Sequence, residues 1–257
     1  MAFGLPKSEL TYADYLKIPE LTSLQHLLSE PPKHDEMLFI VIHQVYELWF
    51  KLLLHEIDGV AEALSKNNAD DAIHLLHRCV EIERILVHQV DVLETMRPID
   101  FLTFRNQLMP ASGLQSAQFR EIEFVSGLKN PAVLKRYETN SEEHTRLNKR
   151  LEAPSILETF YELLSRRGID MKKSKPMDAL KKIYQNPHQY PDLLEICELL
   201  LDYDEMFSRW RLIHVQMVER MIGTKTGTGG TEGVSYLKTT LNQKFFPELW
   251  ELRSNLA

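Results

Sequence analysis

Three long segments with helical spacing constrain this chain more than any other feature of its sequence. They run from Asp35 to about Leu64, from about Ala69 to Met96, and from about Pro191 to Ile222. Within them, apolar and aromatic residues recur every three or four positions, which places them on one face of a helix. No segment shows a sustained alternation of apolar and polar residues, so we expect no substantial sheet. The pattern predicts an all-α helical bundle in one domain spanning residues 1–257.

The remaining segments predict shorter helices and loops. Helical pieces are expected near Phe101–Leu108, Leu114–Leu128, Pro154–Arg167 and Tyr236–Arg253, the last with a break near Pro247. The middle of the chain, about residues 130–189, is the most polar part and is expected to lie outside the core. Its charged side chains favour solvent over burial.

Charge and cysteine content exclude several classes of protein. The net charge of −7 argues against a nucleic-acid or anionic-membrane partner, because either would favour an excess of Lys and Arg. Cys79 and Cys197 lie far apart, so neither a disulfide framework nor a thiolate metal site is indicated. The first residues lack the pattern of a signal peptide. No uninterrupted apolar run reaches ~18 residues, so we expect no membrane span and a cytoplasmic protein.

Two of the ten histidines, His43 and His214, stand in strongly apolar surroundings. His43 lies within FIVIHQVYELWF, and His214 lies deep in the last long helical segment. An imidazole in such surroundings costs free energy unless its nitrogens bind a partner or a metal. Each is therefore a candidate ligand, although a hydrogen-bonded core histidine explains the same pattern.

The spacing of histidines and carboxylates removes the commonest metal sites of helical proteins. The zinc motif HExxH is absent, because Gly59 stands where the second histidine would follow His55 and Glu56. No Glu is followed by a His three residues later, which excludes the di-iron pattern of four-helix bundles. A haem held by one axial histidine, with a second histidine on its open face, stays open.

Arg105 and Thr228 are candidates for binding an anionic group. The guanidinium of Arg105, which ends the sequence FLTFR, suits a carboxylate, although a surface ion pair explains it equally well. Thr228 lies in GTKTGTGGTEG, which holds five of the ten glycines and follows the last long helix. This loop matches neither a phosphate loop nor a dinucleotide fingerprint, and a flexible connector is the simpler interpretation.

Four segments together resemble the tryptophan 2,3-dioxygenase family. They are HDEMLFIVIHQVYELWFKLLLHE, FRNQLMPASGLQSAQFREIEF, WRLIHVQMVERMIG with GTGG downstream, and LTYADYLKI near the start. Their order and spacing agree with the family from about Leu10 to Leu249, whereas residues 130–189 match weakly. The first two segments are long and specific.

The resemblance implies an all-α bundle of long helices that encloses a haem pocket, as in tryptophan and indoleamine dioxygenases. The implied cofactor is haem b with its iron, and the implied assembly is a homotetramer. The implied reaction opens the indole pyrrole ring of L-tryptophan with dioxygen to give N-formylkynurenine, the first step of the kynurenine pathway. A neighbouring subunit is expected to contact the amino-terminal segment, residues 1–30.

The resemblance also implies roles for individual residues. His214 falls on the proximal iron ligand, His43 on the distal histidine that hydrogen-bonds the indole N–H, and Ser112 near the haem edge. The residues implied to contact the substrate are Phe39 and Phe101 as pocket walls, Arg105 at the carboxylate, Thr228 in the loop, and Tyr12, Tyr15 and Leu16 from the neighbouring subunit.

Several positions depart from the family pattern. Ile42, Val45 and Tyr46 replace more polar residues around His43, Leu114 replaces a common Phe, and Glu232 enters the glycine-rich loop. The exact indole substrate therefore stays open. A monooxygenase of the same fold acting on a substituted tryptophan or indole is one alternative. A non-catalytic haem sensor is another, although a sensor would not need the carboxylate clamp of Arg105 and Thr228.

Overall fold

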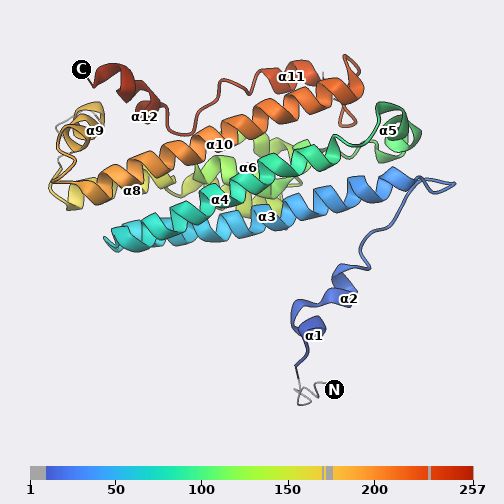
Figure 1. Ribbon diagram of the computed structural model, residues 1–257, viewed down its shortest axis with the longest axis horizontal. Coiled ribbons are helices and arrows are strands. Elements are labelled where there is room, and N and C mark those ends of the chain that lie inside the picture. The colour runs from blue at the N-terminus through green and yellow to red at the C-terminus, as the bar shows by residue number, and fades with distance from the viewer. Residues whose placement is uncertain (1–9, 170, 172–175, 231–232, 257) are drawn as a thin grey trace, which may run out of the picture.

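Three long helices run side by side and form the body of the molecule (Figure 1). They are α3 (His34–Ser65), α4 (Ala69–Leu93) and α10 (Pro191–Ile222). The computed structural model describes residues 10–169, 171, 176–230 and 233–256, and this part of the chain contains no strand. The predicted all-α fold is confirmed. Helix α4 lies between the other two, with close contacts to both α3 and α10.

A tight turn joins α3 to α4 and makes them antiparallel neighbours. Asn67 adopts a left-handed backbone conformation with φ of 59°. The Asn68 side chain accepts a hydrogen bond from the backbone N–H of Asp71 at 3.2 Å. This cap satisfies one of the free N–H groups at the start of α4, and Asp70 and Asp71 in the first turn favour the helix dipole. The pairing places the apolar stripes of α3 and α4 against each other.

Short elements connect α4 to the rest of the bundle. Helix α5 (Pro98–Phe104) continues into a 3-10 turn (Arg105–Leu108), and a second 3-10 turn (Gly113–Gln115) precedes α6 (Ala117–Val125). The sequence predicted one helix over Leu114–Leu128, and this prediction is wrong at both ends. Ser116 caps α6 by accepting from the N–H of Phe119 at 3.1 Å, and Gly127, with φ of 107°, follows its end.

The middle of the chain contributes to the core, contrary to the prediction that it lies outside. It forms a 3-10 turn (Pro131–Arg136), α7 (Glu142–Glu152), α8 (Ile156–Arg166) and α9 (Pro176–Gln185). Each of these helices is amphipathic, so its charged residues face solvent while a narrow apolar face is buried. The fully buried side chains of this region include Leu147, Phe160, Leu163, Leu164, Leu180 and Ile183.

The sequence predicted one helix over Tyr236–Arg253 with a break near Pro247, and this prediction is wrong. The carboxyl-terminal region contains α11 (Val234–Lys238), α12 (Pro247–Leu252) and a final 3-10 turn (Arg253–Asn255), separated by a long non-helical connection. The buried carboxylate of Asp204 on α10 explains the connection. Its Oδ2 accepts from the N–H groups of Phe245 (3.0 Å) and Phe246 (3.1 Å) and from the indole N–H of Trp250 (2.8 Å). The backbone N–H groups of Phe245 and Phe246 are thereby removed from helix formation, and Pro247 begins α12.

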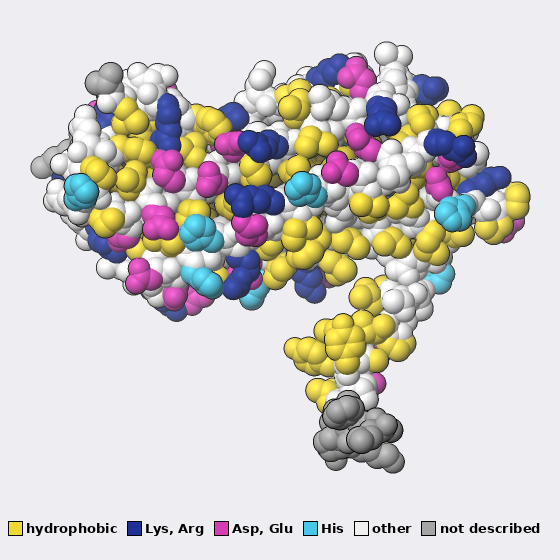
Figure 2. Space-filling model, in the orientation of Figure 1, with side chains coloured by type: hydrophobic (Ala, Val, Ile, Leu, Met, Phe, Trp, Pro, Cys, Tyr) yellow, Lys and Arg dark blue, Asp and Glu magenta, His cyan; other side chains and the backbone are white. Residues whose placement is uncertain are grey.

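The amino-terminal arm, residues 10–30, leaves the bundle and carries α1 (Tyr12–Leu16) and α2 (Ile18–Leu21) (Figure 1). Figure 2 shows hydrophobic side chains gathered on this arm. Tyr12 and Tyr15 are 77% and 72% exposed. Glu36 at the start of α3 accepts from the N–H groups of Leu28 and Ser29, which fixes the point where the arm joins the bundle.

Helix α3 is apolar enough to pass a test for membrane spans. Its mean hydropathy reaches 1.5 over an 18-residue window, of which 22% is buried. The search for an uninterrupted apolar run underestimated the hydropathy of α3, because polar residues such as His43 and Glu47 interrupt the run. The core helix of a soluble protein passes the same test, and α3 packs along α4, α6 and α8. The finding is therefore weak support for a membrane span.

Candidate functional site

One cavity between the long helices brings most of the predicted site residues together. Its walls come from α3, α4, α5, α6, α10 and α11 and from the loops between them. The predicted residues that line it are Phe39, His43, Phe101, Arg105, Ser112, His214 and Thr228. Tyr12, Tyr15 and Leu16 do not line it, because the amino-terminal arm projects away from the bundle. Their contact with a neighbouring subunit remains a prediction.

The tautomer of His43 follows from its hydrogen bond within α3. Its Nδ1 lies 2.7 Å from the carbonyl oxygen of Phe39. A carbonyl oxygen can only accept, so Nδ1 carries the hydrogen and Nε2 has a free lone pair. Burial lowers the pKa of His43, while the Phe39 carbonyl and the nearby charge of Glu47 partly oppose that shift. His43 is therefore a neutral hydrogen-bond acceptor in the cavity.

His214 presents a neutral imidazole from α10 to the same cavity. Burial lowers the pKa of His214 to about 4, and the neighbouring His43 adds to the effect. The Trp210 ring, one helical turn earlier, stacks on the imidazole with ring centres 5.0 Å apart and planes 9° from parallel. A neutral imidazole is the form that binds a metal ion. The described residues contain no cluster of three His, Cys, Asp or Glu side chains, so a metal bound there would depend on few protein ligands.

The lowered pKa of His214 predicts an acid-sensitive fold. The folded-state pKa of His214 is about 4, below the ordinary 6.5, because the buried imidazole resists protonation. The stability that the neutral imidazole contributes is therefore complete above pH 6.5. It is lost as the pH falls towards 4, by about 3 kcal/mol in total. Urea unfolding at a series of pH values should show this loss in the wild-type protein and not in His214→Gln. Parallel pH profiles for the two proteins would contradict the prediction.

Arg105 connects the 3-10 turn after α5 to the glycine-rich loop. Its Nη2 donates a hydrogen bond to the carbonyl oxygen of Thr226. Its Nε is buried and has no hydrogen-bond partner in the described part of the chain. An unpaired buried N–H of a guanidinium is costly unless an acceptor binds it. The group is thus ready to bind a carboxylate at the mouth of the cavity.

Close packing against Ser112 holds the glycine-rich loop over the cavity. A Cβ atom added to Gly229 would lie only 2.6 Å from the Cβ of Ser112. Gly233 has a φ of 59°, and a Cβ there would lie 2.7 Å from the carbonyl oxygen of Lys225. Both positions therefore require glycine. Thr228 reaches the cavity between these contacts, whereas Glu232 lies outside the described residues.

Gly229→Ala should weaken substrate binding by displacing the loop. The added methyl group must push the loop away from Ser112, which moves Thr228 and loosens the Arg105 contact. We expect KM to rise on the order of tenfold, equivalent to about 1.4 kcal/mol. Gly113→Ala is the matched control, because its Cβ would meet no atom within 4 Å. Equal effects of the two substitutions would argue against loop displacement.

A charged cluster that the sequence did not reveal lines another part of the cavity wall. Arg120 on α6 donates to Glu123 Oε2 at 2.5 Å, and Arg211 on α10 donates to Glu123 Oε1 at 3.3 Å. The Nε of Arg120 is buried without a partner among the described residues. Two guanidinium groups thus share the Glu123 carboxylate, while Asp204 also acts on Arg211 and Glu47 lines the same cavity. The only sequence signals were Arg211 three residues before His214 and the i, i+3 spacing of Arg120 and Glu123.

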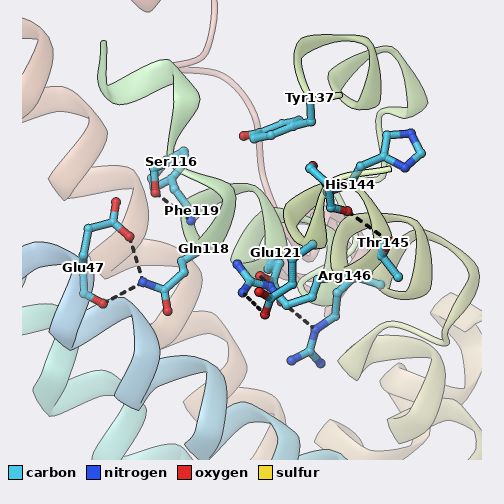
Figure 3. Close-up of polar contacts among 12 residues, drawn as sticks. Glu47, Ser116, Gln118, Phe119, Glu121, Tyr137, His144, Thr145 and Arg146 are labelled. Atoms are coloured by element: carbon cyan, nitrogen blue, oxygen red, sulfur yellow. Dashed lines mark hydrogen bonds and ion pairs between the residues drawn. The ribbon is translucent and has the colours of Figure 1, made fainter. Parts of the chain in front are cut away.

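Helix α6, which carries Arg120, is held in place from both sides. Figure 3 shows Gln118 pointing towards Glu47 of α3. Its amide donates to the carbonyl oxygen (2.9 Å) and to a carboxylate oxygen (2.8 Å) of Glu47. On the other side, Arg146 of α7 donates to Glu121 at 3.1 Å. These contacts position the charged wall relative to His43.

Two residues that depart from the family pattern line the cavity, namely Tyr46 and Leu114. Tyr46 is buried, and its hydroxyl donates to the carbonyl oxygen of Leu86 on α4 at 2.8 Å. Burial raises the pKa of Tyr46 to about 12, so the phenol stays protonated. Ile42 is buried in the core, and its carbonyl oxygen accepts from Gln89 at 2.9 Å. These departures alter the wall without adding a new charge.

Comparison with known proteins gives one consistent result over nearly the whole chain. The family model described as tryptophan 2,3-dioxygenase matches residues 4–175 and 172–256. The chain is 47% identical to tryptophan 2,3-dioxygenase of a Nocardioides species, over 100% of this chain and 98% of that protein. It is 45% identical to the enzyme of Herpetosiphon aurantiacus, over 96% and 98% of the two chains. It is 40% identical to that of Serratia proteamaculans, over 96% and 94%.

Proposed function

Because the chain belongs to the tryptophan 2,3-dioxygenase family, we propose that its cavity binds haem b and catalyses the oxidative opening of the L-tryptophan indole ring. Dioxygen is the second substrate, and N-formylkynurenine is the product. The reaction begins tryptophan catabolism by the kynurenine pathway. The observation that carries the proposal is the presence in one cavity of two neutral imidazoles and of a guanidinium whose Nε has no partner among the described residues.

The residues around the cavity fit a haem. His214 is neutral and would supply a nitrogen ligand, and Val90, Leu93 and Val218 give apolar walls. The guanidinium groups of Arg120 and Arg211 line the cavity and suit an anionic edge, and haem carries carboxylates. When bound, the haem iron would supply the activation of dioxygen. His214 would hold the iron through Nε2.

His43 orients the indole by hydrogen bonding. Its Nδ1 hydrogen is engaged by the Phe39 carbonyl, so its Nε2 is available to accept the indole N–H. An indole N–H is a very weak acid, and a neutral imidazole with a lowered pKa is a poor base for it. His43 therefore acts by positioning rather than by removing the proton. Phe39 and Phe101, whose ring centres lie 5.7 Å apart, wall the indole and exclude water.

Arg105 and Thr228 hold the amino-acid end of the substrate. The Arg105 guanidinium pairs with the carboxylate, and Thr228 contacts the ammonium and carboxylate from the loop. Holding both ends of tryptophan fixes the C2–C3 bond of the indole, so catalysis by the protein is chiefly positioning. Ser112 supports the loop at Gly229 and lies at the edge of the cofactor site.

The same proposal includes the oligomeric state of the protein and its cellular compartment. The protein is a cytoplasmic homotetramer in which residues 1–257 form one catalytic domain. Tyr12, Tyr15 and Leu16 of the amino-terminal arm reach the cavity of a neighbouring subunit. The exposed apolar stripe of α3 supports a subunit contact, since such stripes are costly in water. Its members are Met37, Val41, Leu48 and Leu52.

Absorption and product analysis test the proposed function. The purified protein, supplied with haem and reduced, should show a Soret band that shifts when L-tryptophan is added. With labelled dioxygen, the product should carry two labelled oxygen atoms. One labelled atom would indicate the monooxygenase alternative. A Soret band with no turnover of any indole would indicate a sensor, and no Soret band would refute the proposal.

A further inference from the structure

His214 lacks the hydrogen bond that usually orients a metal-binding histidine. Such histidines normally donate their second ring N–H to a carboxylate or a backbone carbonyl, which fixes the plane of the ring. In the part of the chain that the structure describes, burial and the neighbouring His43 lower the pKa of His214, and no hydrogen bond acts on its ring. Another contact must therefore set the orientation of the imidazole.

The parallel stack of Trp210 on His214 is the contact that can do so. The two residues are one helical turn apart on α10, with ring centres 5.0 Å apart and planes 9° from parallel. Rotation of the imidazole about its Cβ–Cγ bond would drive its edge into the indole face. An offset parallel stack is worth about 0.5–1.5 kcal/mol beyond the area that it buries. This is enough to favour one ring plane.

Trp210 is itself fixed by aromatic rings from two other helices as well as its own. Its ring lies 5.3 Å from that of Phe119 on α6 and 5.9 Å from that of Phe207 on α10. Tyr46 of α3 meets it edge-on at 6.2 Å. The hydrogen bond from the Tyr46 hydroxyl to Leu86 anchors that third ring to α4. The orientation of the Trp210 ring is therefore set by side chains from α3, α6 and α10.

We propose that Trp210 is a positioning residue that fixes the plane of the His214 imidazole by stacking, in place of a hydrogen bond. The proposal rests on the proposed function in taking His214 as the iron ligand. It has a chemical consequence. Without an acceptor for its second N–H, the ligand stays a neutral imidazole and donates less electron density than a hydrogen-bonded one.

The stack can be tested in the protein without haem. The ring current of the indole should move the NMR signals of the His214 ring protons upfield in the wild-type protein. Trp210→Leu should lose this shift, and Trp210→Phe should keep part of it. Phe160→Leu is the matched control, because it removes a fully buried aromatic ring on α8, which does not line the cavity. Unchanged His214 signals in Trp210→Leu would overturn the proposal.

The effect on the ligand is tested after haem is added. The iron–imidazole stretching band of the ferrous protein should be narrow in the wild type, broadened and shifted in Trp210→Leu, and shifted by a smaller amount in Trp210→Phe. An identical band in all three proteins would overturn the positioning role. If Trp210→Leu fails to fold, the Phe variant, with its smaller stack, still decides by a partial shift. If the wild-type protein binds no haem, the proposed function fails, while the NMR result still decides the stack.

Discussion

His214→Ala is expected to abolish haem binding and, with it, all measurable tryptophan oxidation. The lowered pKa near 4 means that the imidazole is neutral at physiological pH and needs no proton release to bind iron. Alanine removes this ligand and leaves the cavity without an imidazole on α10. The measurement is the Soret absorption of the purified variant after haem is added and free haem is removed.

Two comparisons make this result specific. Imidazole added to His214→Ala should restore part of the Soret band, because the small ligand can occupy the space left by the side chain. His43→Ala should keep haem and retain some turnover, since His43 orients the substrate and does not hold the iron. A wild-type spectrum from His214→Ala, with circular dichroism showing an intact fold, would rule out His214 as the ligand.

Arg105→Ala is expected to raise KM for L-tryptophan on the order of 100-fold. Removal of one partner of a charged, partly desolvated pair costs about 3 kcal/mol, and each 1.4 kcal/mol corresponds to a factor of about ten. Arg105→Lys should recover only part of the loss, because an ammonium cannot form the two parallel hydrogen bonds of a guanidinium. Steady-state kinetics of the three proteins measure the effect.

Tryptamine separates the two contacts of Arg105. It lacks the carboxylate, so wild-type protein and Arg105→Ala should oxidise it with similar and poor efficiency. Arg105 also donates to the Thr226 carbonyl, and loss of that bond would loosen the glycine-rich loop for any substrate. If Arg105→Ala impaired tryptamine as strongly as tryptophan, the residue would act on the loop rather than on the carboxylate.

The parts of the fold that sequence reasoning predicted are those governed by local periodicity. The last long helix was predicted with its observed bounds, Pro191–Ile222, because its apolar stripe is continuous and Pro191 suits the first helical position. The region around Phe245 and Phe246 was mispredicted, because its backbone donors bind Asp204, which lies some forty residues earlier in the chain. No local pattern encodes such a tertiary contact.

The residues of the candidate site also fall into those that the sequence identified and those that it missed. His43 and His214 were singled out by their apolar surroundings and Arg105 by its guanidinium, and resemblance to a family then implied their roles. The fold brings all three to one cavity. Trp210 and Arg120 were missed, because an aromatic or a basic residue on an amphipathic helix looks like core or surface until the neighbouring helices are known. Their importance lies in the partners that they meet, the His214 ring and Glu123, and not in their own spacing.

The hydrogen bonds from residues 245–250 to Asp204 bear on the order in which the protein folds and binds its proposed cofactor. Asp204 and His214 lie on one rod-like helix, ten residues and about 15 Å apart. The donors that satisfy Asp204 come from Phe245, Phe246 and Trp250, which the ribosome makes some forty residues after Asp204. A nascent chain would thus expose His214, the proposed iron ligand, while the same helix still carried a carboxylate without these donors. Secure loading of the proposed cofactor should then follow synthesis of residues 245–250 rather than accompany synthesis of α10.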